Sequence, residues 1–374
     1  MARNVRFLLF VVLASAVWAA SAGVAGAARY VVVLDGTAEP AAAARQAQAL
    51  GGTVGHVYTH ALEGFSVSLP AERLGALERI PGVAYVESDG VVRASTTQQN
   101  ATWGLDRIDQ RALPLSTTFT YTATGAGVTA YIVDTGIRRS HQEFGGRAVN
   151  GFDGIGGAGL VDDCNGHGTH VAGTVGGATY GVAKQVRLVS VRVLDCAGVG
   201  LNSTVIAGVD WVTADHQAGQ PAVANMSLGG GASAAVDQAV RNSIADGVSY
   251  AVAAGNESED ACTGSPSRVA EALTIGATDW NDAKASFSDF GPCVDWFAPG
   301  VSITSAWWLT NTSTNTISGT SMATPHTAGV VAQYLQGNPG ASPAAVRTAL
   351  YDLTTMGIVT QSQSANNHLL FTNL

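Results

Sequence analysis

Three side chains that could together perform nucleophilic catalysis lie far apart in this chain. Ser321 stands among small residues at the expected start of a helix, Asp134 is followed by Thr-Gly, and His167 lies in a Gly-His-Gly turn. A neutral serine hydroxyl is a poor nucleophile, so it needs a base that accepts its proton. An imidazole can be that base when a carboxylate orients it and stabilises its charged form. The three residues therefore predict a nucleophilic site of the Ser-His-Asp type.

The order of these residues along the chain, Asp before His before Ser, differs from the chymotrypsin and α/β-hydrolase orders. With their neighbours, the three motifs resemble the subtilisin-like serine proteases (subtilases), in the proteinase K and aqualysin branch, from about Trp103 to the C-terminus. The resemblance implies peptide-bond hydrolysis through an acyl-enzyme, with Ser321 as nucleophile, His167 as base and Asp134 as the orienting acid. His170 competes for the role of base, but the match of the motif favours His167 and leaves His170 a structural role.

The resemblance extends to the residues that would bind substrate. Ala253-Ala254-Gly255-Asn256 matches the family's oxyanion segment, which implies that the Asn256 amide and the Ser321 N–H stabilise the charge of the tetrahedral intermediate. Taken alone, Gly-Asn is also an ordinary turn.

Two glycine-rich segments resemble the walls of the family's pocket for the residue before the scissile bond, and a third resembles an edge strand that pairs with the substrate main chain. Walls of Gly and Ala predict a roomy apolar slot without a charged floor, and hence a loose preference for aromatic or large aliphatic residues. The implied substrate-binding residues are Gly198, Val199, Gly200, Ser227, Leu228, Gly229, Gly230, Ala253, Ala254 and Gly255.

Short apolar runs alternate with helical stretches through most of the chain, which predicts an α/β fold with a mostly parallel sheet and helices on both faces. In such sheets the ligand site lies beyond the carboxyl ends of the strands, where Asp134 and Asn256 are expected. The predicted strands are Val128–Val133, Val186–Val193, Ala222–Met226, Ser249–Ala253 and Leu273–Ala277, and the predicted helices include Ser203–Gln217, Ser233–Asp246 and a last one capped by Ser342 that runs through Tyr351.

The N-terminal part of the chain has its own organisation. Residues 1–27 combine two arginines, an apolar stretch and small residues, which is typical of a signal peptide, although a membrane anchor is the alternative reading. Residues 28–95 follow a β-α-β-β-α-β order, which predicts a small ferredoxin-like sheet. This segment resembles the inhibitory propeptide of subtilases, and it would leave a catalytic domain at 96–374. A permanent accessory domain is the other interpretation.

The net charge of the chain is informative about its partners. All of its net charge of −9 is carried by the residues from 96 onward, because residues 1–95 hold seven arginines and seven acidic residues. An acidic body without a basic run does not favour nucleic acid as a partner. Together with the predicted signal peptide, the resemblance to subtilases implies a secreted, extracellular and monomeric enzyme. Its implied partners are protein or peptide substrates and its own propeptide, which acts as an intramolecular inhibitor.

The chain has four cysteines, Cys164, Cys196, Cys262 and Cys293. An even number in an exported protein predicts two disulfides, but the sequence alone permits three pairings. The resemblance to aqualysin-like enzymes implies Cys164–Cys196 and Cys262–Cys293. Unpaired buried thiols are the alternative, and the absence of a Cys-x-x-Cys pair argues against a zinc site.

Calcium is the expected cofactor, in a structural role only. The side chains of Asp106, Asp109 and Gln110 could converge from one helical turn, and they match an N-terminal calcium site of aqualysin-like enzymes. Asp295 and the carbonyl groups of Ala270 and Ala272 match a second site, of the proteinase K type. Solvated surface carboxylates are the alternative interpretation of both groups.

Two other functions deserve comparison with a secreted endopeptidase. A catalytically silent binding protein on the same scaffold would be expected to lack a triad residue or the oxyanion asparagine, and all four are present. An esterase of the α/β-hydrolase type would carry Gly-x-Ser-x-Gly around its nucleophile, which is absent around Ser321.

Overall fold

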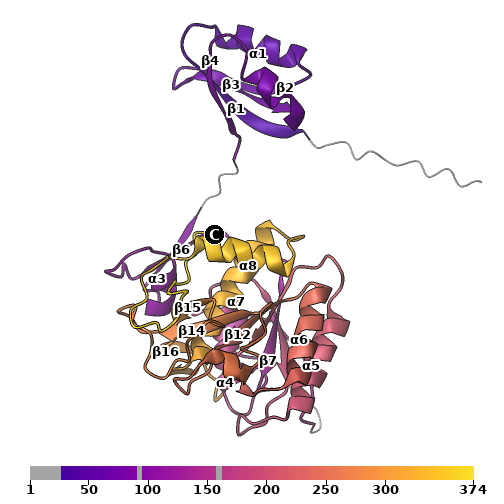
Figure 1. The fold of residues 1–374 in the computed structure, drawn as a ribbon, viewed down its shortest axis with the longest axis vertical. Coiled ribbons are helices and arrows are strands. Elements are labelled where there is room, and N and C mark those ends of the chain that lie inside the picture. Colours follow the sequence, from indigo (N-terminus) through magenta and orange to yellow (C-terminus); the bar gives the residue numbers. More distant parts are fainter. Residues whose placement is uncertain (1–26, 91–94, 157–161) are drawn as a thin grey trace, which may run out of the picture. The chain divides into compact units, whose positions relative to one another are not determined.

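The computed structural model describes residues 27–90, 95–156 and 162–374. The chain divides into two compact units, Met1–Arg93 and Ala94–Leu374 (Figure 1). The predicted signal peptide, residues 1–27, lies almost entirely outside the described ranges. Within those ranges, no helix is both long and apolar enough to cross a membrane.

The first unit is a small antiparallel sheet with strand order β2-β3-β1-β4 and two helical segments, which confirms the ferredoxin-like prediction. In β1, Tyr30, Val32 and Leu34 are buried while the residues between them are more exposed, as a half-buried strand requires. The second predicted helix is reduced to a 3-10 turn followed by one short α-helical turn. The elements are β1 (Ala28–Leu34), α1 (Pro40–Ala49), β2 (Thr53–Thr59), β3 (Glu63–Leu69), η1 (Ala71–Arg73), α2 (Leu74–Leu77) and β4 (Val83–Ser88).

The second unit is built on a seven-stranded parallel sheet with the order β15-β14-β12-β10-β7-β9-β8. The five strands predicted from the sequence are all present, whereas the two edge strands were not predicted. The strands are β7 (Thr129–Asp134), β8 (Ala148–Asp153), β9 (Arg187–Arg192), β10 (Ala222–Met226), β12 (Ser249–Ala253), β14 (Leu273–Thr278) and β15 (Trp296–Pro299).

Helices cover both faces of this sheet, as predicted. In β7, Ala130 and Ile132 join the core under α4 and α7, whereas Tyr131 and Val133 join the core under α5 and α6. Consecutive strand residues point to opposite faces, so burial on both sides requires the continuous apolar run that this strand has. The covering helices, visible in Figure 1, are α4 (His167–Gly176), α5 (Asn202–Asp215), α6 (Ala234–Asp246), α7 (Thr320–Gly337) and α8 (Pro343–Leu353).

Smaller elements complete this unit. The Ser342 hydroxyl caps α8 by accepting from the Ala345 N–H at 3.3 Å, which confirms the predicted cap. The remaining elements are β5 (Thr96–Gln99), α3 (Trp103–Ile108), β6 (Thr118–Tyr121), η2 (Gln142–Phe144), β11 (Gly230–Gly231), η3 (Ala261–Thr263), β13 (Gly264–Ser265), β16 (Ile303–Ala306) and β17 (Thr314–Ile317).

Helix α7 packs closely on its surroundings at Gly329, where a Cβ would lie 2.5 Å from Val182 Cβ. We expect Gly329→Ala to destabilise the catalytic domain by about 1–2 kcal/mol, because overpacking a buried contact outweighs the better helix propensity of alanine. The midpoint of thermal unfolding, measured in a Ser321→Ala background to prevent autolysis, tests this. Gly337→Ala in the same helix is the matched control, since nothing lies within 4 Å of its Cβ position. Equal midpoints for the two variants would contradict the expectation.

Candidate active site

The three candidate catalytic residues sit where secondary-structure elements begin or end. Asp134 is the last residue of β7, His167 is the first of α4, and Ser321 is the second of α7. Carboxyl ends of parallel strands and the helices that follow them meet at one edge of the sheet. Gly166 caps α4 with φ at 114°, and a Cβ there would lie 2.5 Å from the Trp307 ring, so this position requires glycine.

Asp134 and His167 form the pair that the sequence predicted. His167 Nδ1 lies 2.8 and 2.9 Å from the two carboxylate oxygens of Asp134, whose side chain is completely buried. Burial lowers the pKa of His167, but the charge and hydrogen bond of Asp134, with a further contribution from Asp163, raise it more, so the pKa lies above its usual value. The arrangement leaves Nε2 as the nitrogen that can exchange a proton with a substrate or nucleophile.

Asp163 holds this pair in place, and the sequence analysis did not identify it. Its carboxylate accepts hydrogen bonds from the Thr135 hydroxyl at 2.9 Å, from the Gly166 N–H at 2.9 Å and from Thr169. Thr135 in turn accepts from the N–H of Gly168 at 2.9 Å, next to His167. In the sequence, this residue is only an aspartate two positions before an asparagine in a turn. That pattern is common, and the hydrogen-bond partners of the aspartate are known only once the fold is known.

Ser321 is positioned by Ser227, which lies just beyond β10. Pro325 has no N–H, so it cannot bond to the carbonyl of Ser321 as an ordinary helical residue would. That carbonyl accepts instead from the Ser227 hydroxyl at 2.8 Å, and the Ser321 hydroxyl donates to the Ser227 carbonyl at 3.1 Å. Among the described residues, no hydrogen bond joins the Ser321 hydroxyl to His167, so a side-chain rotation must precede proton transfer between them.

His170 has the structural role expected of it. It is fully buried, its Nε2 bonds to the Ile303 carbonyl at 3.0 Å, and burial lowers its pKa to about 4. His326, five residues after Ser321, is also buried, and burial lowers its pKa to about 4. Both imidazoles are therefore neutral near pH 7 and belong to the core.

Asn256 is held through its side-chain oxygen, and no hydrogen bond within the described residues engages its amide nitrogen. Its Oδ1 accepts from the Thr320 N–H at 2.8 Å and lies 3.1 Å from the Thr320 hydroxyl, directly before Ser321. Fixing the oxygen orients the NH₂ group, which remains available to a ligand. The N–H of Ser321 belongs to the first turn of α7, whose amides have no partner within the helix. The two donors expected for an oxyanion thus lie on adjoining segments.

Two hollows flank Leu228–Gly230 beside these groups. The first has a volume of about 480 Å³ and is bounded by Ser321, Asn256 and both predicted pocket walls. The second, of about 440 Å³, is bounded by His167, Ser227 and Gly198–Gly200. All ten predicted substrate-binding residues line one hollow or both. Gly198–Gly200 itself lies outside any strand, because the Val199 N–H and carbonyl are engaged by Asp195 in a turn.

One expectation about the first hollow is wrong. Its walls are Gly and Ala as predicted, but Glu257, Glu259 and Asp289 also line it. The prediction of an uncharged floor did not consider Glu257 and Glu259, which closely follow Asn256 in the sequence, and it could not anticipate Asp289, which comes from a distant loop after β14.

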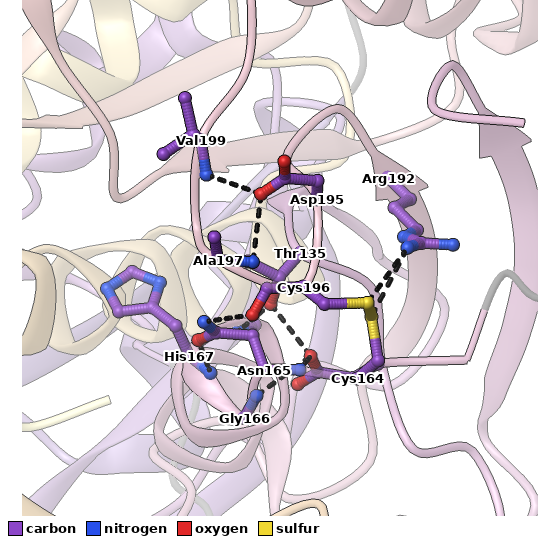
Figure 2. Close-up of a disulfide and its surroundings, with 12 residues drawn as sticks. Thr135, Cys164, Asn165, Gly166, His167, Arg192, Asp195, Cys196, Ala197 and Val199 are labelled. Atoms are coloured by element: carbon purple, nitrogen blue, oxygen red, sulfur yellow. Dashed lines mark hydrogen bonds between the residues drawn. A yellow bond between two sulfur atoms is a disulfide. The ribbon is translucent and has the colours of Figure 1, made fainter.

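Both disulfides implied by the resemblance are present, Cys164–Cys196 and Cys262–Cys293. Figure 2 shows that the first joins the segment before His167 to the segment that leads into Gly198–Gly200. Asn165 strengthens this link, because its amide donates to the Cys196 carbonyl at 3.0 Å and its Oδ1 accepts from the His167 N–H at 3.1 Å. The covalent bond therefore ties the candidate base to one side of the second hollow.

The first predicted calcium site has oxygen atoms that suit a cation. Asp109 Oδ1 is buried and has no hydrogen-bond partner in the part of the chain that the structure describes, and burial raises the Asp109 pKa to about 6. Asp106 and Gln110 lie beside it, and oxygens of both accept from the Ser116 N–H. No group of three or more His, Cys, Asp or Glu side chains in the described ranges could hold a metal, so this site would rely on amide and carbonyl oxygens as well.

The residues of the second predicted calcium site do not fit a metal ion. The guanidinium of Arg347, in α8, donates both to the Ala270 carbonyl and to the Asp295 carboxylate. Ala272 lies in the same loop, directly before β14. A side-chain cation therefore stands where calcium was expected, and the sequence analysis missed it because Arg347 comes more than 50 residues after Asp295.

The raised pKa of His167 leads to a pH prediction. Only the neutral imidazole can accept the Ser321 proton, so kcat/KM should rise with pH through a pKa above 6.5. Asp134→Asn should lower that pKa and reduce kcat by about 10⁴-fold. NMR titration of the histidine ring protons measures the pKa directly, in mature Ser321→Ala protein from which an added protease has removed the propeptide. Buried His170 and His326 are internal references, and exposed Asp210→Asn is the control variant. An unchanged His167 pKa in Asp134→Asn would contradict the assigned cause.

Comparisons with known proteins agree with this geometry. The Subtilase family matches residues 125–370, and the Peptidase inhibitor I9 family matches residues 29–95. An "Extracellular serine proteinase" of Thermus sp. (strain Rt41A) is 58% identical over 334 residues, which cover 87% of this chain and 81% of that protein. "Alkaline serine exoprotease A" of Vibrio alginolyticus is 52% identical, over 84% of this chain and 59% of its own length. The solved structure of a cold adapted subtilisin-like serine proteinase is 52% identical, with a TM-score of 0.72, and the match covers 74% of this chain and all of that one. The chain belongs to the subtilase family of serine proteinases and carries an I9-type propeptide domain before its catalytic domain.

Proposed function

We propose that this chain is a secreted endopeptidase of broad specificity that cleaves peptide bonds through an Asp134–His167–Ser321 triad. The observation that carries the proposal is the buried Asp134 carboxylate bonded to His167 Nδ1, at the edge of the sheet where α7 presents Ser321. The I9 match at residues 29–95, which precede α3 in the chain, supports synthesis as a precursor. The protein acts extracellularly as a monomer, after loss of a signal peptide within residues 1–27.

In the proposed mechanism, the Ser321 hydroxyl turns from the Ser227 carbonyl to His167 Nε2. The imidazole accepts its proton as Oγ attacks the substrate carbonyl, and Asp134 stabilises the imidazolium. The Asn256 amide and the Ser321 N–H donate to the resulting oxyanion. His167 then protonates the leaving amine, and a water molecule, activated by the same base, hydrolyses the acyl-enzyme.

Substrate selection in this proposal follows from the two hollows. The first receives the side chain before the scissile bond, with a preference for aromatic or aliphatic groups against Ala253 and Ala254. The second receives the preceding residues, whose main chain pairs with Gly198 and Gly200. Main-chain pairing reads no side chains, which favours broad specificity.

The function is tested by the precursor of Ser321→Ala. We expect this variant to remain uncut at the length of residues 28–374, because removal of the propeptide, with cleavage near residue 95, is autocatalytic. Mass spectrometry of protein expressed in a host lacking other proteases measures the cleavage, with Ser286→Ala, an exposed serine outside the site, as the control that matures normally. Mature-sized Ser321→Ala protein would show that another enzyme performs the cut.

We also propose that Asp106, Asp109 and Gln110 hold a structural calcium ion. The supporting observation is the buried Asp109 Oδ1 without a donor. A bound divalent cation would supply the positive charge that this carboxylate lacks and would stabilise only the folded state. At Asp295 the Arg347 guanidinium supplies that charge, so no calcium is proposed there.

Chelation should therefore shorten the half-life of the enzyme at elevated temperature without abolishing its initial activity. The effect should be largest above pH 6, because Asp109 has its pKa raised to about 6 in the metal-free protein and a protonated carboxyl is a poor ligand. Asp109→Asn should lose the response to chelator, whereas exposed Asp210→Asn should keep it. Equal inactivation rates with and without chelator in the wild-type enzyme would contradict the site.

A further inference from the structure

A polar side chain lies in the apolar middle of the parallel sheet, where packing does not call for one. Asn225 is a completely buried residue of β10, the strand at the centre of the sheet. Its partners in register on the two neighbouring strands are Ile132 and Ala251, and both belong to the core under α4 and α7. An amide in such surroundings is tolerated only with hydrogen-bond partners, so its partners should indicate its role.

Only one end of this amide has a partner among the described residues. Asn225 Nδ2 donates to the Ser227 hydroxyl at 2.9 Å, whereas Oδ1 is buried and no donor of the described chain reaches it. A buried acceptor without a donor destabilises a fold. The stability of the sheet therefore does not explain why an amide occupies this position.

The direction of the bond to Ser227 follows from the next bond in the chain of contacts. The Ser227 hydroxyl has one proton, and it donates this proton to the Ser321 carbonyl at 2.8 Å, which can only accept. The same hydroxyl must therefore accept from Asn225, and only the NH₂ group of the amide can donate. Two bonds thus run in one direction, from Asn225 to Ser227 and from Ser227 to Ser321.

The end of this chain of bonds is the turn that carries the nucleophile. Because Pro325 provides no N–H, the Ser321 carbonyl depends on the Ser227 hydroxyl for its donor. The N–H and the hydroxyl of Ser321 belong to the same residue and move with this carbonyl. Their distances to a reacting carbonyl group must be maintained closely, since small displacements of reacting groups have large effects on rate.

We propose that Asn225 is a positioning residue for the nucleophile. Its amide donor occupies a lone pair of the Ser227 oxygen and so directs the hydroxyl proton to the Ser321 carbonyl, which fixes the first turn of α7. Asn225 itself contacts neither the substrate nor the reacting atoms. The inference rests on the proposed endopeptidase function and adds a residue to its site.

The first test replaces the amide by an apolar side chain that suits a buried strand. In mature Asn225→Val, kcat for a tetrapeptide p-nitroanilide should fall about tenfold while KM stays within about twofold, because substrate binding does not use this bond. The midpoint of thermal unfolding, measured in mature Ser321→Ala protein, should not fall, because valine removes the oxygen that lacks a donor. Asn225→Ala should show the same loss of kcat, and it keeps the test decisive if valine does not fit.

The second test asks whether Asn225 acts through the Ser227 hydroxyl. Ser227→Ala should lower kcat about tenfold or more, and Asn225→Val should then cause no further loss in the Ser227→Ala enzyme, because the hydroxyl that it directs is gone. Val223→Ala is the matched control, since Val223 lies two residues earlier on the same face of β10 and is also completely buried. It should lower the unfolding midpoint and leave kcat within about twofold.

Three results would overturn the inference. They are an unchanged kcat in both Asn225 variants, equal losses from Asn225→Val with and without the Ser227 hydroxyl, and a loss of kcat in Val223→Ala as large as that in Asn225→Val. The last result would mean that activity follows the packing of the strand rather than the amide. Failure of the wild-type enzyme to cleave the peptide substrate would instead contradict the endopeptidase function.

Discussion

The completely buried carboxylate of Asp134 is the constraint on which the active site depends. A charge removed from water is tolerated only when hydrogen bonds and an opposite charge replace its hydration. The Thr135 N–H at 2.7 Å and the His167 imidazole provide them. The same contacts fix the orientation of the imidazole and raise its pKa, so the requirement for stability of this carboxylate is also the requirement for catalysis. Asp163 extends the arrangement by holding Thr135 and the start of α4.

Ser321 is positioned by an interruption of the backbone hydrogen bonding at the start of helix α7. Proline at position 325 removes the hydrogen bond that would occupy the Ser321 carbonyl, and Ser227 takes its place from the end of β10. A helix start is thereby fastened to a strand end by a side chain rather than by regular backbone pairing. This explains how a nucleophile on a helix can be positioned against groups that belong to the sheet, and why the Gly-Thr-Ser-Met-Ala-Thr-Pro sequence carries structural as well as chemical information.

The sequence predicted what depends on local pattern or on a complete motif. The five central strands and the pairing of Asp134 with His167 were predictable, because apolar runs and glycine-rich motifs are local signals. The positions of Asp289 in the first hollow and of Arg347 beside Asp295 were not, because both side chains come from distant segments. Glu257 and Glu259, by contrast, closely follow Asn256 in the sequence and could have been considered. The edge strand β15 (Trp296–Pro299) was missed because four residues ending in proline carry too little periodicity.

The buried carboxylates of this protein differ in the hydrogen-bond donors and cations that surround them, and this difference indicates their roles. Asp163 accepts hydrogen bonds from Thr135, Gly166 and Thr169, and Asp295 is neutralised by Arg347, so both are structural. Asp134 is engaged by the His167 imidazole, a group that can itself exchange protons, as the proposed catalytic role requires. Asp109 retains an oxygen that no donor of the described chain reaches. Since an unsatisfied buried carboxylate destabilises the fold, Asp109 is the position where an external cation, such as the calcium ion proposed there, contributes most.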